Sequence, residues 1–481
     1  MANSTNANGS ATLPTRQTDG SEPATTANPN PFVPGKPAIE HGNPMAKKLL
    51  AKLDYDQLTN CMRCGFCLPA CPTFRETGLE PESPRGRIAL MKAVADGLMD
   101  PDQAFQDQMN HCLGCRACEP ACPADVKYGQ LIEQARDAIE DHAEHSAPIK
   151  GVRKLMFKGV FPHRNRLKWL GRSLAFYQKS GLRPLARGTG IMKLFPKHLR
   201  EMERILPDAT GKGVVERLGT VYPAKGEKIA RVALFRGCIM DVMFAETNVN
   251  TVKLLSEAGF EVVIPESQVC CGALHAHSGE MDQARDLART NLRAFREAGV
   301  EYIVSNAGGC GALLVEYDHL LHDDPQYREL GEWFASRVVD VSKLIVEKGR
   351  VPEFAEPQAS AASEPVTITY QDSCHLRNVM KSAGAPRQLM NQVSGARFCE
   401  MKDSDRCCGS AGIYNVTQPE MAGQILEHKM EHANATNARY LLTSNPGCLL
   451  QMKLGIEKHG AAGKMEAMHV VDYLYERTRN P

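Results

Sequence analysis

Two different spacings of apolar residues divide the chain. In its first part, apolar residues recur at helical spacing, which predicts helices at residues 45–58, 84–99 and 128–143. From residue 229 onward, short apolar runs of strand length alternate with helical stretches. Such alternation is typical of βαβ units on a mostly parallel sheet. The pattern therefore predicts an all-α N-terminal part followed by an α/β part.

The α/β part is predicted to contain one structural unit twice. Five buried strands bounded by turn residues are expected, at 231–235, 261–264, 302–305, 366–370 and 440–444. Helices are expected between the strands of the first copy, at 247–258 and 281–298. Four cysteine positions of the first copy recur after 136 to 138 residues. A nearly constant offset marks an internal repeat of two equivalent halves.

These patterns predict six segments. They are a disordered tail (1–44), a helical domain (45–145), a basic helical connector (146–228), a first α/β domain (229–350), a linker (351–365) and a second α/β domain (366–481). The tail is rich in Ser, Thr, Asn, Pro, Gly and Ala, and it cannot bury enough apolar surface to become ordered.

The connector carries an unusual run of positive charge. Residues 150–200 contain fourteen Lys or Arg and no Asp or Glu, with aromatic and aliphatic residues between them. Basic amphipathic segments bind anionic membrane surfaces or acidic partner proteins. Alternatively, the segment is a solvated connector whose charges are balanced by acidic residues elsewhere in the chain.

Composition adds one strong signal, which is the cysteine content. The 481 residues have a net charge of +1, so nothing here indicates binding to nucleic acid. No secretory signal is recognisable, and no stretch reaches the roughly 18 apolar residues of a spanning helix. Seventeen cysteines in a non-secreted chain indicate metal ligation rather than disulfides. We expect a cytoplasmic protein, either soluble or peripheral on the cytoplasmic membrane.

The densest cysteines form two runs with identical spacing. Both fit C-x2-C-x2-C-x3-C-P without a mismatch. In this pattern three thiolates hold one [4Fe–4S] cluster, and the fourth ligates the neighbouring cluster. We therefore predict two clusters, one held by Cys61, Cys64, Cys67 and Cys122 and the other by Cys112, Cys115, Cys118 and Cys71.

Two alternatives concern this helical domain. A pair of four-cysteine zinc sites also uses C-x2-C pairs, but zinc gives no reason for the third C-x2-C step or for the proline that follows. Arg85 and Arg87 stand at the start of the helix predicted after the first run. They either offset the negative charge of a cluster or form an ordinary solvated helix start.

The repeated cysteines include two adjacent pairs, Cys270–Cys271 and Cys407–Cys408. Neighbouring residues lie too close together for an unstrained disulfide. Their side chains point in different directions, which suits two irons of one cluster better than two corners of a zinc site. The eight repeated positions follow strand ends, where α/β folds place ligands. They are Cys238, Cys270, Cys271, Cys310, Cys374, Cys407, Cys408 and Cys448.

Together these motifs resemble a known family. Cys-x31-Cys-Cys-Gly-x37-Cys and Cys-x32-Cys-Cys-Gly-x38-Cys resemble the cysteine-rich CCG domains of heterodisulfide reductases and their relatives. Two helical-ferredoxin motifs followed by two such domains resemble the iron–sulfur subunit of glycolate oxidase (glycolate dehydrogenase). The likeness covers about residues 50–475 and is carried by Cys64–Phe74, Pro84–Arg87, Asp372–Leu376 and Asn445–Gln451.

The resemblance implies an electron-transfer subunit of a flavin-dependent dehydrogenase that oxidises glycolate to glyoxylate. No Gly-x-Gly-x-x-Gly element opens a helix after a strand, so the FAD and the catalytic site are expected on a partner subunit, and a quinone is expected as the acceptor. The alternatives are the iron–sulfur subunit of an anaerobic glycerol-3-phosphate or lactate dehydrogenase, a heterodisulfide-reductase-like catalytic subunit, and a zinc-bound scaffold.

The chain departs from the reductase pattern at Leu313 and Gln451, where reductase domains carry a further cysteine. Each half therefore keeps four thiolates, which disfavours a noncubane double cluster and leaves one ordinary cluster or a single metal. Cys399 has no counterpart in the first copy and is expected to be a buried, inert thiol. Three histidines near the cysteines either complete a site or lie outside it: His275, His277 and His375.

Overall fold

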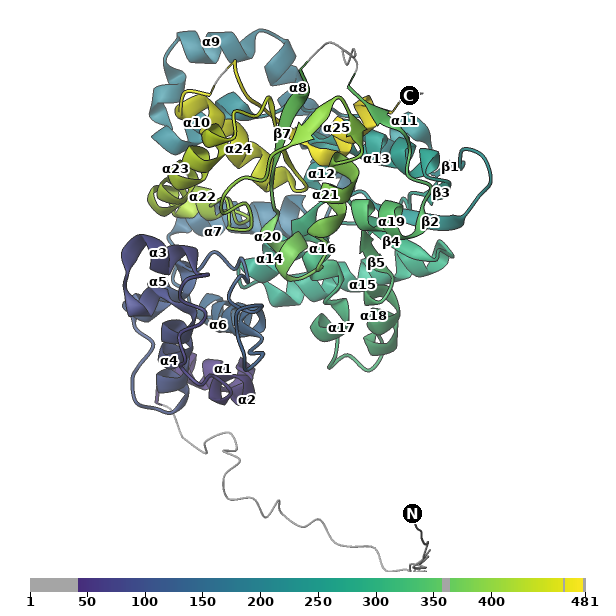
Figure 1. Cartoon of the computed structure of the whole chain (residues 1–481). Coiled ribbons are helices and arrows are strands. Elements are labelled where there is room, and N and C mark those ends of the chain that lie inside the picture. The colour runs from purple at the N-terminus through teal and green to yellow at the C-terminus, as the bar shows by residue number, and fades with distance from the viewer. Residues whose placement is uncertain (1–41, 357–363, 462, 479–481) are drawn as a thin grey trace, which may run out of the picture.

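The computed structural model describes residues 42–356, 364–461 and 463–478. A group of helices that contains both cysteine runs lies beside a larger body built on two sheets (Figure 1). Nearly all of the tail predicted to be disordered, residues 1–41, lies outside the described residues.

The N-terminal domain consists of helices around one apolar core. Leu49, Leu58, Met91, Met109 and Leu131 come from different helices and are buried together in it. The two cysteine runs occupy the loops between α2 and α3 and between α5 and α6. The helices are α1 (Pro44–Lys52), α2 (Tyr55–Thr59), α3 (Pro72–Thr77), the short 3-10 helix η1 (Glu80–Glu82), α4 (Pro84–Ala95), α5 (Gln103–Asn110) and α6 (Tyr128–Glu140).

Predicted helix boundaries in this domain are wrong at three places, and the helix expected to reach residue 143 ends at Glu140. The helix expected over residues 45–58 is two helices, because Leu53 is extended and the side chain of Asp54 accepts a hydrogen bond from the backbone N–H of Gln57 and so begins a new helix. The helix expected to continue to residue 99 ends at Ala95. Leu98 lies beyond this end and is 79% exposed.

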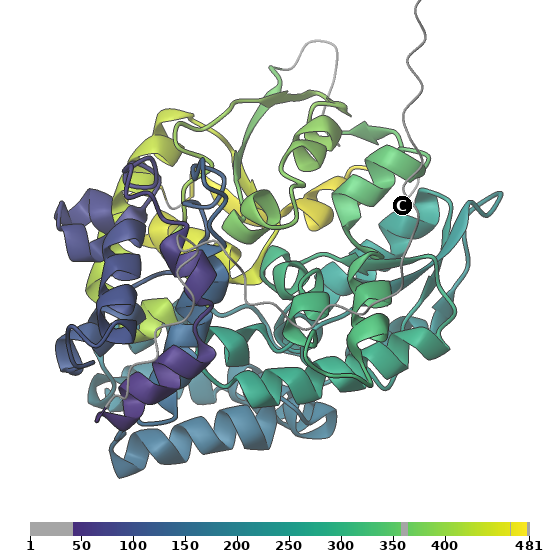
Figure 2. The ribbon, with the colours of Figure 1, turned by 90° about the horizontal axis from the view of Figure 1, so that it is seen from below.

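The connector forms a series of helices along the outside of the molecule. Its blue helices line the lower edge of Figure 2. Helix α8 packs on the molecule through Leu167, whose side chain is buried, and through Gly171. Gly171 lies so close to Val242 that a Cβ atom added to it would come within 2.6 Å of the valine side chain. The elements are α7 (Ala147–Arg153), a π-helical segment η2 (Lys154–Val160), α8 (Arg164–Lys179), α9 (Leu182–Gly188), η3 (Ile191–Leu194) and α10 (Lys197–Ile205).

The first α/β half is built on a five-stranded sheet. Its strand order is β1-β3-β2-β4-β5, and all neighbours are parallel except β1 and β3. Strand β1 lies in the segment assigned to the connector. The strands are β1 (Val221–Tyr222), β2 (Ala230–Phe235), β3 (Phe260–Val263), β4 (Tyr302–Ser305) and β5 (Val338–Asp340). The helices are α11 (Val214–Leu218), α12 (Ile239–Met243), α13 (Ala245–Glu257), α14 (Ala273–His277), α15 (Met281–Glu297), α16 (Gly308–Leu314), α17 (Tyr317–Leu320), α18 (Arg328–Ala335) and α19 (Val341–Lys348).

The second half is built on a four-stranded parallel sheet with the order β11-β10-β7-β9. Part of the predicted linker also forms a strand, because β6 (Phe354–Ala355) pairs with β8 (Val393–Ser394). The strands of the sheet are β7 (Val366–Gln371), β9 (Ala396–Phe398), β10 (Tyr440–Thr443) and β11 (Glu466–His469). The helices are α20 (Cys374–Asn378), α21 (Gly384–Met390), α22 (Tyr414–Thr417), α23 (Pro419–Ala435), α24 (Pro446–Lys458) and α25 (Val470–Glu476).

The two halves meet across a seam at which the loops after β4 and β10 touch. The backbone N–H of Gly308 donates to the carbonyl oxygen of Ser444, and the N–H of Gly309 donates to Oδ1 of Asn445, each at 3.0 Å. One apolar core continues from the first half into the second. Because the repeated cysteines follow the carboxyl ends of the parallel strands, this seam brings the cysteine loops of both halves close together.

Candidate functional site

The first predicted cysteine set lies near the surface of the helical domain. Cys61, Cys64 and Cys67 of the first run share one pocket with Cys122 of the second run. Cys64 is exposed, and the other three are half-buried. The loop turns tightly here because Gly65 has a φ of 90°, in the left-handed region that favours glycine. Cys118, which was assigned to the second set, also lines this pocket, so thiols of both runs meet here.

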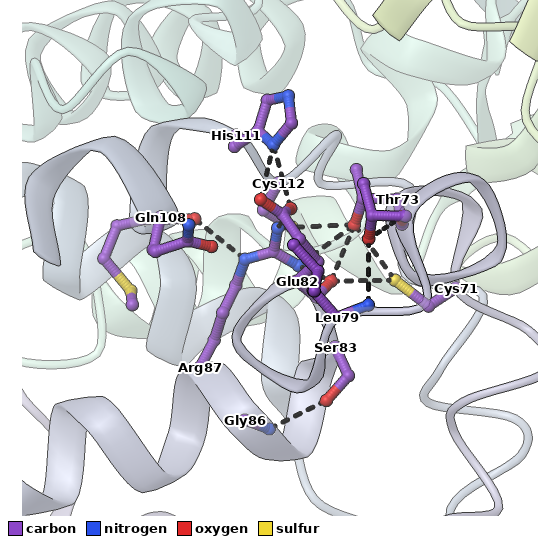
Figure 3. Close-up of polar contacts among 12 residues, drawn as sticks. Cys71, Thr73, Leu79, Glu82, Ser83, Gly86, Arg87, Gln108, His111 and Cys112 are labelled. Carbon is purple, nitrogen blue, oxygen red and sulfur yellow. Dashed lines mark hydrogen bonds and ion pairs between the residues drawn. The ribbon is translucent and has the colours of Figure 1, made fainter. Parts of the chain in front are cut away.

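The second predicted set is buried. Cys71, Cys112, Cys115 and Cys118 are all buried, and the thiol of Cys118 interacts electrostatically with those of the other three. Cys71 and Cys112, one from each run, both interact electrostatically with Arg87 and are drawn with it in Figure 3. The crossed grouping again brings one cysteine of the first run among three of the second.

Donor groups surround the sulfur of Cys112. The N–H of Gly114 donates to its Sγ at 3.3 Å, and the hydroxyl of Tyr128 donates at 3.5 Å. Burial opposes ionisation, but the charges of Arg87 and Arg136 together with these hydrogen bonds hold the pKa of Cys112 below its ordinary value. This environment favours the thiolate, which is the form that binds a metal.

The four cysteines of the first α/β half form a chain of contacts. The Sγ atoms of Cys238 and Cys270 lie 3.4 Å apart. Cys270 contacts Cys271, which in turn contacts Cys310. The backbone N–H of Gly272 donates to Sγ of Cys270 at 3.5 Å. These cysteines come from the loops after β2 and β3 and from helix α16, which follows β4, so the shared strand-end edge gathers them.

The second half gathers its cysteines in the same way. Cys374 contacts Cys407, and Cys408 contacts both Cys407 and Cys448. This set also touches the helical domain, because Cys115 makes a thiol–thiol contact with Cys407. The side-chain amide of Asn378 donates to the carbonyl oxygen of Cys115 at 3.0 Å and holds the two domains together at this point.

The thiol sets fit iron–sulfur clusters on chemical grounds. The thiol contact with Cys407 and burial raise the pKa of Cys374, and the contact with Cys270 and burial raise that of Cys238. Crowded thiols of this kind ionise together only when bound cations offset their charge. Among the described residues, no three His, Cys, Asp or Glu side chains converge on the position of a single metal ion. The ligands of a four-iron cube bind separate irons and need no such common point.

Neither position of the missing fifth cysteine offers a substitute ligand. Leu313 is buried in the apolar core of the first half. Gln451 is buried too, and its side-chain amide donates to the carbonyl oxygen of Ala422 at 3.5 Å and accepts from Asn415 at 3.2 Å. Each half therefore presents four thiols.

The three histidines near the cysteines bind other parts of the chain. Nε2 of His275 donates to the carbonyl oxygen of Phe157 at 2.9 Å, and Nδ1 of His277 lies 2.8 Å from Oε1 of Glu133. The third, His375, donates from Nε2 to the carbonyl oxygen of Gly114 at 2.9 Å. All three hydrogen bonds connect an α/β half to the helical domain or the connector, so these histidines hold domains together.

One prediction about the remaining cysteine is wrong. Cys399 is half-buried rather than buried, because β9 is a short strand at the edge of the second sheet. Sequence reasoning also missed three side chains near the thiols, namely Tyr128, Arg136 and Asn445. No spacing in the sequence relates Tyr128 or Arg136 to Cys112, because only the packing of α6 places them there.

Some cations of the connector form ion pairs with acidic residues of the chain. Arg164 and Lys168 pair with Glu216, Arg183 and Arg187 with Glu203, Arg153 with Glu140 and Glu280, and Lys197 with Glu201. Six of the fourteen cations are thus balanced by acidic residues, as the alternative interpretation expected.

The outer face of α8 differs from its inner face. Trp169 and Phe176 are 70% and 65% exposed there, and they alternate with the exposed cations Arg166, Arg172 and Lys179. None of these three cations forms an ion pair with a described residue. In the described part of the chain, no helix is both long enough and apolar enough to cross a membrane.

Comparison with known proteins agrees with these features. A 4Fe-4S dicluster domain matches residues 57–126, and a cysteine-rich domain matches twice, at 232–314 and 368–453. The linker region of the glycolate oxidase iron-sulfur subunit matches 148–206. The chain is 50% identical over 426 residues to the probable glycolate oxidase iron-sulfur subunit of Bacillus subtilis (strain 168), which covers 88% of this chain and 95% of that protein. The chain belongs to the glycolate oxidase iron–sulfur subunit family.

Other relatives are more distant. The glycolate oxidase iron-sulfur subunit of Escherichia coli (strain K12) is 28% identical over 420 residues, which is 86% of this chain and 93% of that protein. Lactate utilization protein A of Geobacillus thermodenitrificans is 30% identical over 248 residues, which is 51% of this chain and 99% of that protein. The family expected from the cysteine motifs is thus confirmed, and the lactate-related proteins match only half of the chain.

Proposed function

We propose that this chain is the electron-carrying iron–sulfur subunit of a flavin-dependent complex that oxidises glycolate. The observation that carries the proposal is that sixteen cysteines lie in close groups of thiols, in a chain of this family. A [4Fe–4S] cluster takes up and releases one electron at a time.

We assign two such clusters to the helical domain. Their ligands are Cys61, Cys64, Cys67 and Cys122 for one cluster and Cys71, Cys112, Cys115 and Cys118 for the other. The surface position of Cys64 supports electron exchange with a partner at the first set, and the buried second set adjoins Cys407 of the second half.

We assign a further iron–sulfur cluster to each α/β half. The ligands are Cys238, Cys270, Cys271 and Cys310 in the first half and Cys374, Cys407, Cys408 and Cys448 in the second. We also propose that the halves are pseudo-equivalent repeats. Their parallel strands occur in the same order, β3-β2-β4-β5 and β9-β7-β10-β11, which places the cysteines of both halves at matching strand ends.

The partner is proposed to be a subunit that contains FAD and removes hydride from the 2-hydroxyacid. This chain lacks a Gly-rich dinucleotide motif, so the substrate chemistry belongs to that subunit. The final acceptor is proposed to be a quinone at the cytoplasmic membrane.

The exposed face of α8 supports a site at the membrane surface. Aromatic side chains that alternate with unpaired cations suit the interface of an anionic bilayer, where the rings enter the headgroup region and the cations meet lipid phosphates. The connector thus provides a reversible attachment for a chain that reduces a membrane-soluble acceptor.

The test is to coexpress this chain with its neighbouring flavoprotein, purify the complex anaerobically and measure quinone reduction with glycolate, lactate and glycerol 3-phosphate. We expect activity with glycolate and loss of quinone reduction, but not of flavin reduction, when Cys64 and Cys67 are replaced by alanine. Preference for lactate or glycerol 3-phosphate would instead support the related dehydrogenases. Stoichiometric zinc without iron would overturn the proposal.

A further inference from the structure

Helix α4 begins with two arginines that lie in different surroundings. Arg85 and Arg87 are separated only by Gly86, and the chain turns so tightly that a Cβ atom on Gly86 would lie 2.0 Å from the carbonyl oxygen of Glu80. Arg85 lines the pocket of the first cysteine set and is partly exposed. The side chain of Arg87 has no exposed surface and lies at the second set.

Contacts on every side fix the guanidinium of Arg87 (Figure 3). Its Nε donates to the carbonyl oxygen of Gln108 at 2.8 Å, and Nη1 donates to the carbonyl oxygen of Glu82 at 2.5 Å. Its Nη2 donates to Oε2 of Glu82 at 2.7 Å, and both terminal nitrogens lie 3.3 Å from Oγ1 of Thr73. Thr73 follows Cys71 closely and Gln108 precedes the second run, so Arg87 joins the two cysteine runs.

Arg87 acts electrostatically on one cysteine from each run. Oγ1 of Thr73, which lies beside both terminal nitrogens of Arg87, is 3.3 Å from Sγ of Cys71. The carbonyl oxygen of Glu82, which accepts from Nη1 of Arg87, is 3.5 Å from the same sulfur. Arg87 also interacts electrostatically with Cys112. Arg85, in contrast, interacts with Cys67 and Cys61 and is held by an ion pair with Glu80 at 2.6 Å.

The hydrogen bonds of Arg87 give it a structural role, but they do not by themselves explain why a full positive charge is buried here. Moving a charge out of water is costly, and a buried ion pair is often replaceable by apolar side chains of similar volume without loss of stability. Arg87 and Glu82 form such a pair, with exposed side-chain fractions of 0% and 6%. The cation therefore calls for an explanation in terms of what it faces, which is the second thiol set.

We propose that Arg87 is a positioning residue that raises the reduction potential of the cluster assigned to Cys71, Cys112, Cys115 and Cys118, and that Arg85 acts only on the cluster assigned to Cys61, Cys64, Cys67 and Cys122. The inference rests on the cluster assignment of the proposed function. Reduction adds one negative charge to a cluster, so a fixed cation beside its ligands stabilises the reduced form. Water and salt screen Arg85 but do not reach Arg87.

The test is a redox titration of each cluster, followed by low-temperature electron paramagnetic resonance in anaerobic protein. Cys64→Ala first identifies which signal belongs to the first set. Arg87→Gln is then expected to lower the midpoint potential of the second cluster and leave the first unchanged, whereas Arg85→Gln lowers only the first. Raising the salt concentration is expected to shrink the Arg85 effect and preserve the Arg87 effect.

Two further variants separate charge from packing. Arg87→Lys keeps the positive charge and is expected to retain a potential close to that of the unaltered protein. If Arg87→Gln fails to fold, the variant at its counter-charge, Glu82→Gln, tests the proposal instead. Glu82→Gln removes the counter-charge and is expected to shift the second cluster in the opposite direction. Normal iron content with unchanged potentials in both Arg87→Gln and Glu82→Gln would overturn this inference alone. Absence of iron from the unaltered protein would overturn the proposed function as well.

Discussion

Nε2 of His469 donates a hydrogen bond to the carbonyl oxygen of Asn306 at 2.9 Å, across the seam between the two α/β halves. Nδ1 of the same ring accepts from the backbone N–H of Val471 and caps helix α25. Both bonds together require the neutral ring with its proton on Nε2. The second half is thus joined to the first by a histidine that must stay uncharged.

We predict that this histidine makes stability depend on pH. Burial lowers the pKa of His469 from 6.5 to about 4. Between these values the unfolded chain binds a proton that the folded chain does not, so stability falls as pH drops from 6.5 toward 4 and is insensitive above that range. The full effect is about 3 kcal/mol.

His469→Gln is expected to reduce the slope in this pH range without abolishing it, since a glutamine does not titrate, whereas His375, whose pKa burial also lowers to about 4, still does. The measurement is the urea midpoint followed by circular dichroism at several values of pH, with the exposed His322→Gln as control. An unchanged slope in His469→Gln would show that the ring is not the titrating group.

Iron content tests the crossed cysteine assignment. Anaerobically purified protein is expected to hold at least about eight irons, the content of two cubes. Cys64→Ala is expected to remove or degrade one cluster and leave the other, because Cys64 is exposed and its loss disturbs no core. Metal analysis and paramagnetic resonance give the result, with the exposed Met62→Ala as control. Equal loss of both clusters would contradict independent ligand sets.

The thiols of the second half are expected to hold iron beyond the two cubes. Cys408 contacts two other thiols of its set, so Cys408→Ser is expected to reduce iron below the level of the unaltered protein. Cys399→Ser serves as control, because Cys399 is half-buried at the end of β9 and outside the set. Iron at about the two-cube level in the unaltered protein would mean that the α/β halves carry no cluster.

Several of these features could be predicted because local chemistry dictates them. Cluster ligation fixes cysteine spacing, so the sequence predicts that the two runs come together, and Cys61, Cys64 and Cys67 do share one pocket with Cys118 and Cys122 of the second run. The division of the eight thiols between two clusters stays a prediction. Strand β4 has its predicted bounds, Tyr302–Ser305, since turn residues flank a short apolar run. The sequence did not indicate which of Arg85 and Arg87 is buried. The burial of Arg87 depends on Thr73 and Gln108, which reach it only when the domain has folded.

The ion pairs of the connector could not be predicted, because they join residues that are distant in the sequence. Residues 150–200 contain cations but no acidic residue. The partners Glu140, Glu203 and Glu216 lie outside that window, and the fold places them beside the cations. Charge counting along the chain therefore showed an excess of cations but not which of them remain unpaired.

The outer face of α8 carries three cations that form no ion pair with a described residue, and we expect them to bind anionic lipid. Arg166→Glu, Arg172→Glu and Lys179→Glu together are expected to prevent sedimentation with anionic vesicles at low salt. Each cation near such a surface contributes about 1 kcal/mol, so losing three weakens binding by at least about a hundredfold. The matched control reverses three exposed lysines elsewhere, Lys348, Lys402 and Lys464, and has the same net charge.

Trp169 provides an independent measure of the same event. It is one of two tryptophans in the chain, and its emission is expected to shift to shorter wavelength when the exposed ring enters the headgroup region. The shift is expected to disappear at high salt and in the triple variant, and to persist in the control. If the triple variant still binds vesicles but no longer copurifies with the flavoprotein, this face docks the partner subunit, and the membrane proposal is wrong.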